Sequence, residues 1–154
     1  MADSKRQKIV DAVVAALEEI SVANGFETEL GANVNDWEIN FQDDELPAVS
    51  VCDLTEDVQA DMNDEHVDIY RLPVAIRVSI AADTRAAECR KMIADVLKAV
   101  GANENWTVSG EKLALRTDLK EAGFVLDQEA FRIAAVQVQI EIYYHTERWN
   151  YYVT

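Results

Sequence analysis

Carboxylates are the most abundant side chains here that could do chemistry, and histidines are the rarest. The 154 residues include 29 Asp and Glu but only two His, His66 and His145. Both lie among acidic or polar residues, as solvent-exposed histidines do, whereas a catalytic base or ligand needs a defined partner. Carboxylate pairs at glycosidase spacing arise by chance in so acidic a chain, and no aromatic cleft motif accompanies them.

Sequence motifs of enzymes are absent as well. The chain has no GxGxxG, P-loop, GxSxG or HExxH pattern, which are the patterns that place phosphates, nucleophiles or zinc. Cys52 and Cys89 lie far apart without CxxC spacing, so we expect free buried thiols rather than a redox pair or a metal site. The sequence therefore predicts that this is not an enzyme and that it has no cofactor and no metal.

The acidic stretch "CDLTEDVQADMNDEHVD" is the one candidate calcium site. An EF-hand loop that began at Asp53 would require Gly at its sixth position and Glu at its twelfth. This chain has Val58 and Asp64 there. We predict a solvated acidic loop at about 53–66, with weak divalent-cation binding as the alternative. A loop of this length usually has a function.

Charge is distributed unevenly along the chain. The formal net charge is -15, and residues 9–70 contain seventeen acids and no Lys or Arg, whereas residues 71–154 contain eleven of each sign. An acidic field repels phosphates at long range, which argues strongly against a protein that binds nucleic acid tightly. It does not exclude a protein past which DNA slides without specific binding.

Length and composition indicate one soluble domain over residues 1–154. Hydrophobic residues make up 49% and charged residues 28% of the chain, which are the proportions of an ordinary globular protein. The N-terminal apolar run is interrupted by Asp11, Glu18 and Glu19, so neither a signal peptide nor a membrane span is expected. We expect a cytoplasmic protein.

Two amphipathic helices follow from hydrophobic periodicity. Ser4 can cap a helix at about 5–23, with Asn24-Gly25 as its left-handed stop. Asp83 or Thr84 can cap a second helix that ends at Gly101. Each has apolar residues on one face at the 3.6-residue period.

Alternating segments predict strands in much of the rest. "VNDWEINF" and "ELPAVSV" suggest a hairpin across an acidic turn. "VDIYRLPVAIRVSI" and "AAVQVQIEIYY" suggest two long strands, and Pro73 indicates an edge or bulge in the first because it cannot donate to a ladder. A shorter strand is expected near 113–116.

Strands without βαβ alternation predict an α+β fold, with a mostly antiparallel mixed sheet and two helices packed on one face. The 14 residues of the first long strand would span roughly 46 Å at about 3.3 Å per residue. A compact chain of this length has a diameter of about 38 Å. We expect the long strands to bend around the body or to project from it toward another subunit.

The C-terminal end of the chain is rich in aromatic residues. Residues 143–152 hold five of the twelve aromatics, where the last strand should leave the core. Large exposed aromatics usually mark an interaction site. We predict contacts with an adjacent subunit or other partner by Tyr143, Tyr144, Trp149, Tyr151 and Tyr152, most firmly by the three in the aromatic tail at 147–154.

The order of these elements resembles the tail terminator proteins of long-tailed bacteriophages. The resemblance covers nearly the whole chain and depends on the N-terminal amphipathic helix, "LPAVSV" after an acidic turn, "YRLPVAIRVSI" leading through "AADTRAAE" into the second helix, and a final strand running into "YYHTERWNYY". That family forms hexameric rings that cap the tail tube, end its polymerisation and offer a docking surface to the head. The resemblance implies the same non-enzymatic assembly role.

Several expectations follow from the resemblance. The partners would be further copies of this chain, the tail tube protein and the head-tail connector proteins, and the location would be the virion neck, with the host cytoplasm during assembly. We expect the acidic loop to line the lumen through Glu56, Asp57, Asp61, Asp64 and Glu65, so that like charge keeps passing DNA from sticking. Where the family often has Asp-Pro near the end of its last strand, this chain has Trp149-Asn150. Alternatives are another neck component, such as a head-tail joining or tail completion protein, and a non-viral acidic calcium-binding or protein-binding module.

Overall fold

Two α-helices form where the periodicity predicts them. In the computed structural model, which describes residues 2–60 and 65–152, α1 spans Lys5–Glu18 and α2 spans Ala86–Gly101. The Ser4 hydroxyl caps α1 by accepting a hydrogen bond from the Gln7 amide at 3.1 Å. The cap of α2 is Arg85 instead of Asp83 or Thr84. Helix α1 also ends earlier than expected, because Val22–Asn24 forms a separate 3-10 turn, η1, before Gly25 takes a left-handed conformation.

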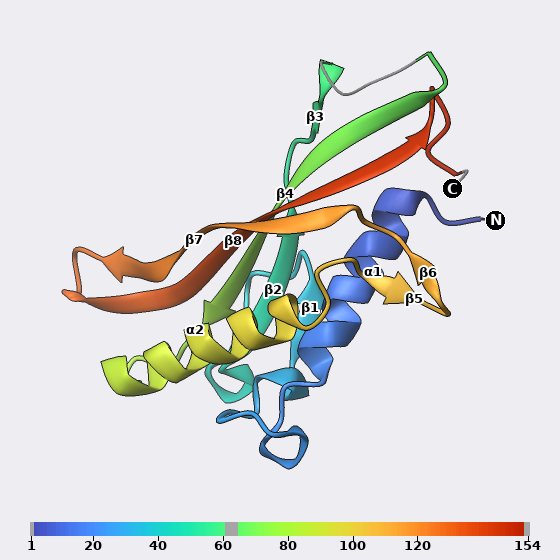
Figure 1. The fold of residues 1–154 in the computed structure, drawn as a ribbon. Helices are drawn as coiled ribbons and strands as arrows, with labels where there is room; N and C mark the ends of the chain where they lie inside the picture. Colours follow the sequence, from blue (N-terminus) through green and yellow to red (C-terminus); the bar gives the residue numbers. More distant parts are fainter. Residues whose placement is uncertain (1, 61–64, 153–154) are drawn as a thin grey trace.

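Six strands within the described residues form one mixed sheet in the order β1-β2-β4-β8-β7, with β3 also paired to β4 (Figure 1). Their bounds are β1 Val34–Asp36, β2 Ala48–Asp53, β3 Asp57–Val58, β4 Val67–Ser79, β7 Arg116–Asp127 and β8 Arg132–Glu147. The β1–β2 pair is parallel and the other pairs are antiparallel. Two short strands, β5 Thr107–Val108 and β6 Glu111–Lys112, form a separate ribbon. The α+β prediction with a mostly antiparallel mixed sheet is confirmed.

The predicted hairpin between residues 34–41 and 45–51 is wrong. Strand β1 ends at Asp36 and pairs with β2 in parallel. Trp37 has φ 60°, which turns the chain out of the sheet, and its side chain and that of Ile39 are half exposed. Residues 37–41 therefore do not form a strand, although their apolar and polar side chains alternate. The 3-10 turn η3, Asp43–Glu45, lies in the connection that returns the chain to β2.

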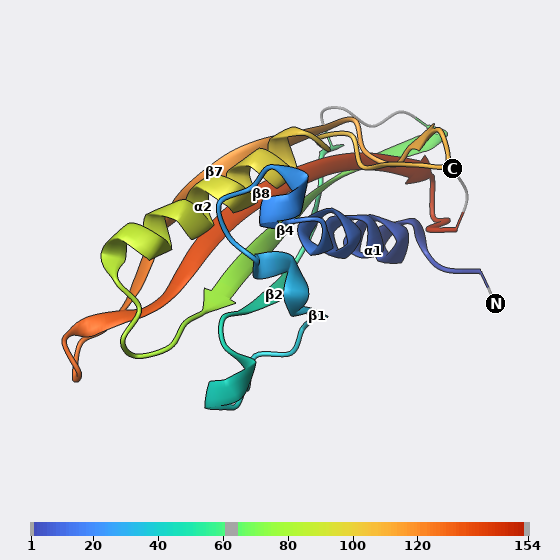
Figure 2. The same cartoon turned by 90° about the horizontal axis from the view of Figure 1, so that it is seen from below.

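Both helices cover the same face of the sheet (Figure 2), as predicted. The even-numbered residues of β4 and β8 point to that face and are fully buried, from Leu72 to Val78 and from Val136 to Ile142. Helix α1 adds side chains with no exposed surface, among them Val13 and Leu17. The two Cys residues are buried free thiols, as expected. This single cluster is the hydrophobic core.

Pro73 marks a break in the pairing along one side of β4. The register with β2 ends at Val74, and that with β3 begins at Arg71. The Leu54 amide donates to the Pro73 carbonyl at 2.8 Å, so the prolyl nitrogen faces the same side, where no donor is required. The predicted irregularity is confirmed. Its consequence is that residues 54–56 leave the sheet between β2 and β3 and carry Glu56 toward α1.

The β7–β8 hairpin gives the molecule its length. Strand β8 has 16 residues, and the hairpin tip lies at the opposite end from both chain termini (Figures 1 and 2). Figure 2 shows that these strands also curve. The expected bending is thus observed, and β7 forms the outer edge of the sheet.

Candidate functional site

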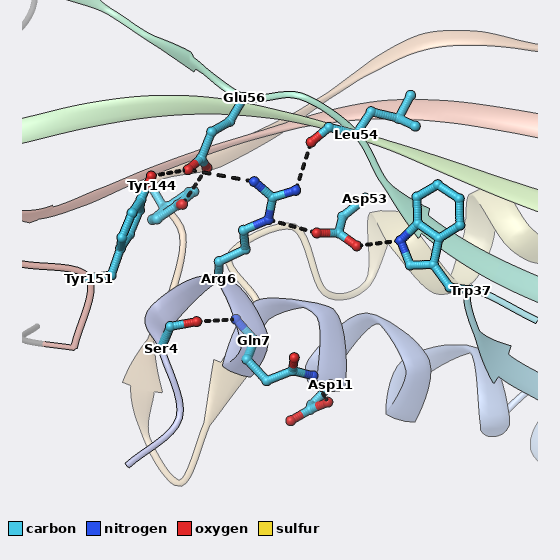
Figure 3. A network of polar contacts seen from close by, with 10 residues as sticks. All are labelled: Ser4, Arg6, Gln7, Asp11, Trp37, Asp53, Leu54, Glu56, Tyr144 and Tyr151. Atoms are coloured by element: carbon cyan, nitrogen blue, oxygen red, sulfur yellow. Dashed lines mark hydrogen bonds and ion pairs between the residues drawn. The ribbon is translucent and has the colours of Figure 1, made fainter. Parts of the chain in front are cut away.

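Glu56 lies at the centre of a polar cluster that joins the two ends of the chain (Figure 3). Its carboxylate accepts hydrogen bonds from the hydroxyls of Tyr144 and Tyr151 and lies 3.6 Å from the Arg6 guanidinium. The Glu56 side chain is only 8% exposed. Glu56 was predicted to line the lumen of a ring; within this subunit its side chain is buried. The carboxylate is turned inward and already has three partners.

Arg6 connects this cluster to the β2 end of the sheet. Its Nε donates to the Asp53 carboxylate at 2.6 Å, and its guanidinium also donates to the Leu54 carbonyl at 2.8 Å. The indole nitrogen of Trp37 donates to the same carboxylate at 2.8 Å. Burial raises the pKa of Asp53, but the hydrogen bonds from Arg6 and Trp37 outweigh it and hold that pKa below its usual value. Asp53 stays charged, so the Arg6 ion pair persists at neutral pH.

The tyrosines in the cluster are kept protonated. Burial, with the neighbouring Glu56 charge and its hydrogen bonds, raises the pKa of Tyr144 and of Tyr151 well above the usual value. Tyr70 packs against both side chains, with ring centroids 5.3 Å from each. Two hydroxyl donors that face one carboxylate form a structural contact. Neither hydroxyl is available as a general base.

Among the described residues, the other two predicted acids, Asp57 and Glu65, do not join the cluster around Glu56. Asp57 pairs with Arg71 across the β3–β4 ladder, and Glu65 lies 3.7 Å from the exposed His66. Asp61 and Asp64 fall outside the described residues. In the ranges 2–60 and 65–152, no three His, Cys, Asp or Glu side chains are placed to hold a metal ion.

The five aromatic residues at the C-terminal end divide into buried and exposed groups. Tyr144 has no exposed surface, and Tyr143 is 9% exposed with the Arg116 guanidinium 4.3 Å from its ring centroid. The expectation that these two contact a partner does not fit this placement, because each already packs within its own subunit. Trp149 is 89% exposed and Tyr152 is 58% exposed. Tyr151 is 40% exposed, and its hydroxyl donates to the Glu56 carboxylate.

The exposed aromatic segment is held firmly on the domain. The Lys5 amide donates to the Tyr151 carbonyl at 2.8 Å, and the Lys5 ammonium donates to the His145 carbonyl at 2.7 Å. The Trp149 amide donates to Asp68 at 3.3 Å, and the Arg148 amide donates to the His66 carbonyl at 2.9 Å. The segment therefore presents Trp149 and Tyr152 in a fixed position, which lowers the entropy that a contact would cost.

Sequence reasoning missed a second apolar surface, on the β7–β8 hairpin. It bears Leu119, Phe124, Leu126 and Phe131, which are 57%, 37%, 64% and 94% exposed. Strand β7 was not expected beyond residue 116, because its alternation is irregular: the register with β8 shifts at Leu119/Glu121 and again at Val125/Leu126. The spacing of Phe124, Leu126 and their neighbour Ala122 was the available signal.

His145, near the end of β8, offers a test of the packing under the C-terminal aromatic segment. It was expected in solvent but is half-buried, and burial, aided by the charge of Lys5, lowers its pKa. As pH falls below the usual His value of about 6.5, the unfolded chain takes up a proton before the folded protein does, so stability falls. In chemical denaturation between about pH 7 and pH 5, His145→Gln should flatten the decline that wild type shows.

Wild type is the reference for this titration. An unchanged slope in His145→Gln would show that His145 is equally solvated in the folded and unfolded states.

No family model matches the chain, and a search of curated proteins finds no match to it. Neither helix in the described part of the chain is long and apolar enough to cross a bilayer.

Proposed function

We propose that this protein is a structural subunit of a bacteriophage neck that assembles into a hexameric ring on the tail tube, ends tube polymerisation and forms the docking surface for the head. The observation that carries the proposal is the anchored aromatic segment, with Trp149 89% exposed on a backbone held by hydrogen bonds to β4 and α1. A large apolar side chain fixed in solvent is typical of an interface that forms later.

The fold and the charge distribution support the same function. The order of the elements is the one on which the resemblance to tail terminators depends, and the helix-covered α+β sheet is the architecture which that resemblance implies. The acidic half of the chain would keep DNA from adhering as it passes. Of the acids proposed for the lumen, Asp57 and Glu65 have exposed side chains.

The test is a double variant, Trp149→Asn with Tyr152→Asn. Deleting residues 149–154 would also remove the contacts of Tyr151 with Lys5 and Glu56, whereas the double variant leaves them intact. We expect it to fold as wild type, to lose the hexamer in native mass spectrometry, and to leave tail tubes uncapped. Tube lengths in negative-stain electron microscopy, grown from tail tube protein with and without this chain, report capping.

The control is Ile39→Asn, which removes a side chain that is 55% exposed in the acidic half of the chain. It should assemble and cap as wild type does. A hexamer that leaves tube length unchanged would favour another neck component over a terminator. Normal capping by the double variant would show that the aromatic segment has no partner in the assembly.

A further inference from the structure

Phe131 and Trp149 are exposed at backbone positions that do not favour them. Phe131 has φ 51° and is 94% exposed, and Trp149 has φ 62° and is 89% exposed. Positive φ is uncommon for residues other than Gly, Asn and Asp, and such conformations cluster at functional sites. The domain gains neither ring burial nor a turn-forming side chain from either residue.

Two other tryptophans with positive φ are explained by the fold itself. Trp106 has φ 49° but is 1% exposed, and its indole donates to the Thr117 hydroxyl at 2.9 Å. Trp37 donates to Asp53. Phe131 and Trp149 therefore differ from these two, and contact with another molecule would account for their side chains.

Phe131 belongs to a wider apolar surface, here called the hairpin surface, made of Leu119, Phe124, Leu126 and Phe131. Leu119 lies opposite Ile140 and Phe124 opposite Val136, so both face the same side as the core, where they remain exposed. Among the described residues, β7 is also an edge strand of the sheet. Its outer row of N–H and C=O groups is open to a further contact.

Trp149 belongs to the second surface, here called the C-terminal surface, made of Trp149, Tyr151 and Tyr152. Phe131 precedes the start of β8 and Trp149 follows its end, whereas Leu119 lies beside the middle of β8, opposite Ile140. The hairpin tip and the C-terminus lie at opposite ends of the molecule (Figures 1 and 2). The two surfaces differ in chemistry, because one is an aliphatic and Phe stripe on a strand and the other is a set of large amphipathic aromatics.

Charge favours another copy of this chain as the occupant. The protein carries -15, but residues 116–133 contain four acids and three bases, and residues 147–152 contain one of each. Glu56 and Asp68, the acids of residues 9–70 that contact the C-terminal surface, are each 8% exposed and hydrogen-bonded within the subunit. Two copies that meet through these surfaces therefore bring few exposed acids together. A different partner selected for a protein this acidic would be basic and would bind residues 9–70 instead.

We infer that the hairpin surface of one subunit packs on the C-terminal surface of the next, in a head-to-tail contact between copies. A contact between two different patches repeats from copy to copy and gives a closed ring or a filament, whereas one patch meeting itself stops at a dimer. This contact would close the proposed hexamer, so the inference rests on the proposed function.

The test is complementation between two variants, each of which lacks one of the two surfaces. The hairpin variant carries Leu126→Asn and Phe131→Asn, and the C-terminal variant carries Trp149→Asn and Tyr152→Asn; Asn tolerates the positive φ at 131 and 149. Each variant alone should be monomeric. An equimolar mixture, with one variant isotopically labelled, should give heterodimers and nothing larger in native mass spectrometry, because each mixed pair keeps one complete contact.

The outcomes separate the contact from the function. Dimers of the C-terminal variant alone would mean that hairpin surfaces pair with each other, and a wild type that stays monomeric at its highest soluble concentration would mean that neither surface binds a copy. Either result overturns the inference. Heterodimers from the mixture, together with wild-type protein that fails to cap tubes, would overturn the proposed function and leave the contact standing.

Discussion

Gly31→Ala should destabilise this protein by about 3 kcal/mol, at the upper end of the usual range for overpacking. Gly31 lies in the 3-10 turn η2, Leu30–Ala32, directly against the end of α1. A Cβ at this position would lie 2.2 Å from the Glu18 carbonyl oxygen and 2.7 Å from that of Ile20. Both atoms are backbone, so relief requires moving the end of α1 itself. Urea denaturation followed by circular dichroism measures the loss.

Gly101→Ala is the matched control for this substitution. Gly101 is the last residue of α2, and a Cβ there would meet nothing within 4 Å. Ala should stabilise the protein by about 0.4–1 kcal/mol, because it restricts the unfolded chain and suits a helix. Equal effects from the two substitutions would show that the connection from Ile20 to Leu30 does not pack on α1.

Glu56→Ala should lower the free energy of unfolding by about 2–4 kcal/mol, because a buried hydroxyl without a partner costs about 1–3 kcal/mol and a hydrogen bond to a charged group contributes about 1.5–3 kcal/mol. The loss falls chiefly on Tyr144, which has no exposed surface through which water could replace the carboxylate. Arg6 loses less stabilisation, because its guanidinium keeps its hydrogen bonds to Asp53 and to the Leu54 carbonyl. Denaturant titration gives the magnitude, and hydrogen exchange at residues 145–151 should quicken.

The neighbouring carboxylate and a double-mutant cycle test this explanation. Asp57→Ala removes an exposed partner of Arg71 and should change stability far less than Glu56→Ala, because solvent screens an exposed ion pair. On a Tyr144→Phe background, Glu56→Ala should cost less than it does in wild type, since the hydroxyl that it would orphan is gone. Additive effects of the two substitutions would mean that Tyr144 and Glu56 are not coupled.

The sequence by itself determined the parts of the fold that depend on local periodicity. Helices α1 and α2 and the inward faces of β4 and β8 follow from the spacing of apolar residues, because 3.6-residue and two-residue repeats select one face of a helix or strand. Ser4 capped α1 as expected, and the break at Pro73 follows from its missing donor. Each of these signals lies within a few residues of the structure that it specifies.

Only the tertiary structure decided which distant residues meet. Glu56 was assigned to a solvated loop, but it is 88 residues from Tyr144 and 95 from Tyr151. No local pattern predicts that the β3–β4 and β4–β8 ladders together bring them close. The parallel pairing of β1 with β2 could not be predicted from the sequence either. Alternation shows which side chains share a face of a strand, but not which strand lies beside it. The exposed hairpin surface has the same origin. Its apolar side chains resemble core residues in sequence, and their exposure is set by where β7 lies in the sheet.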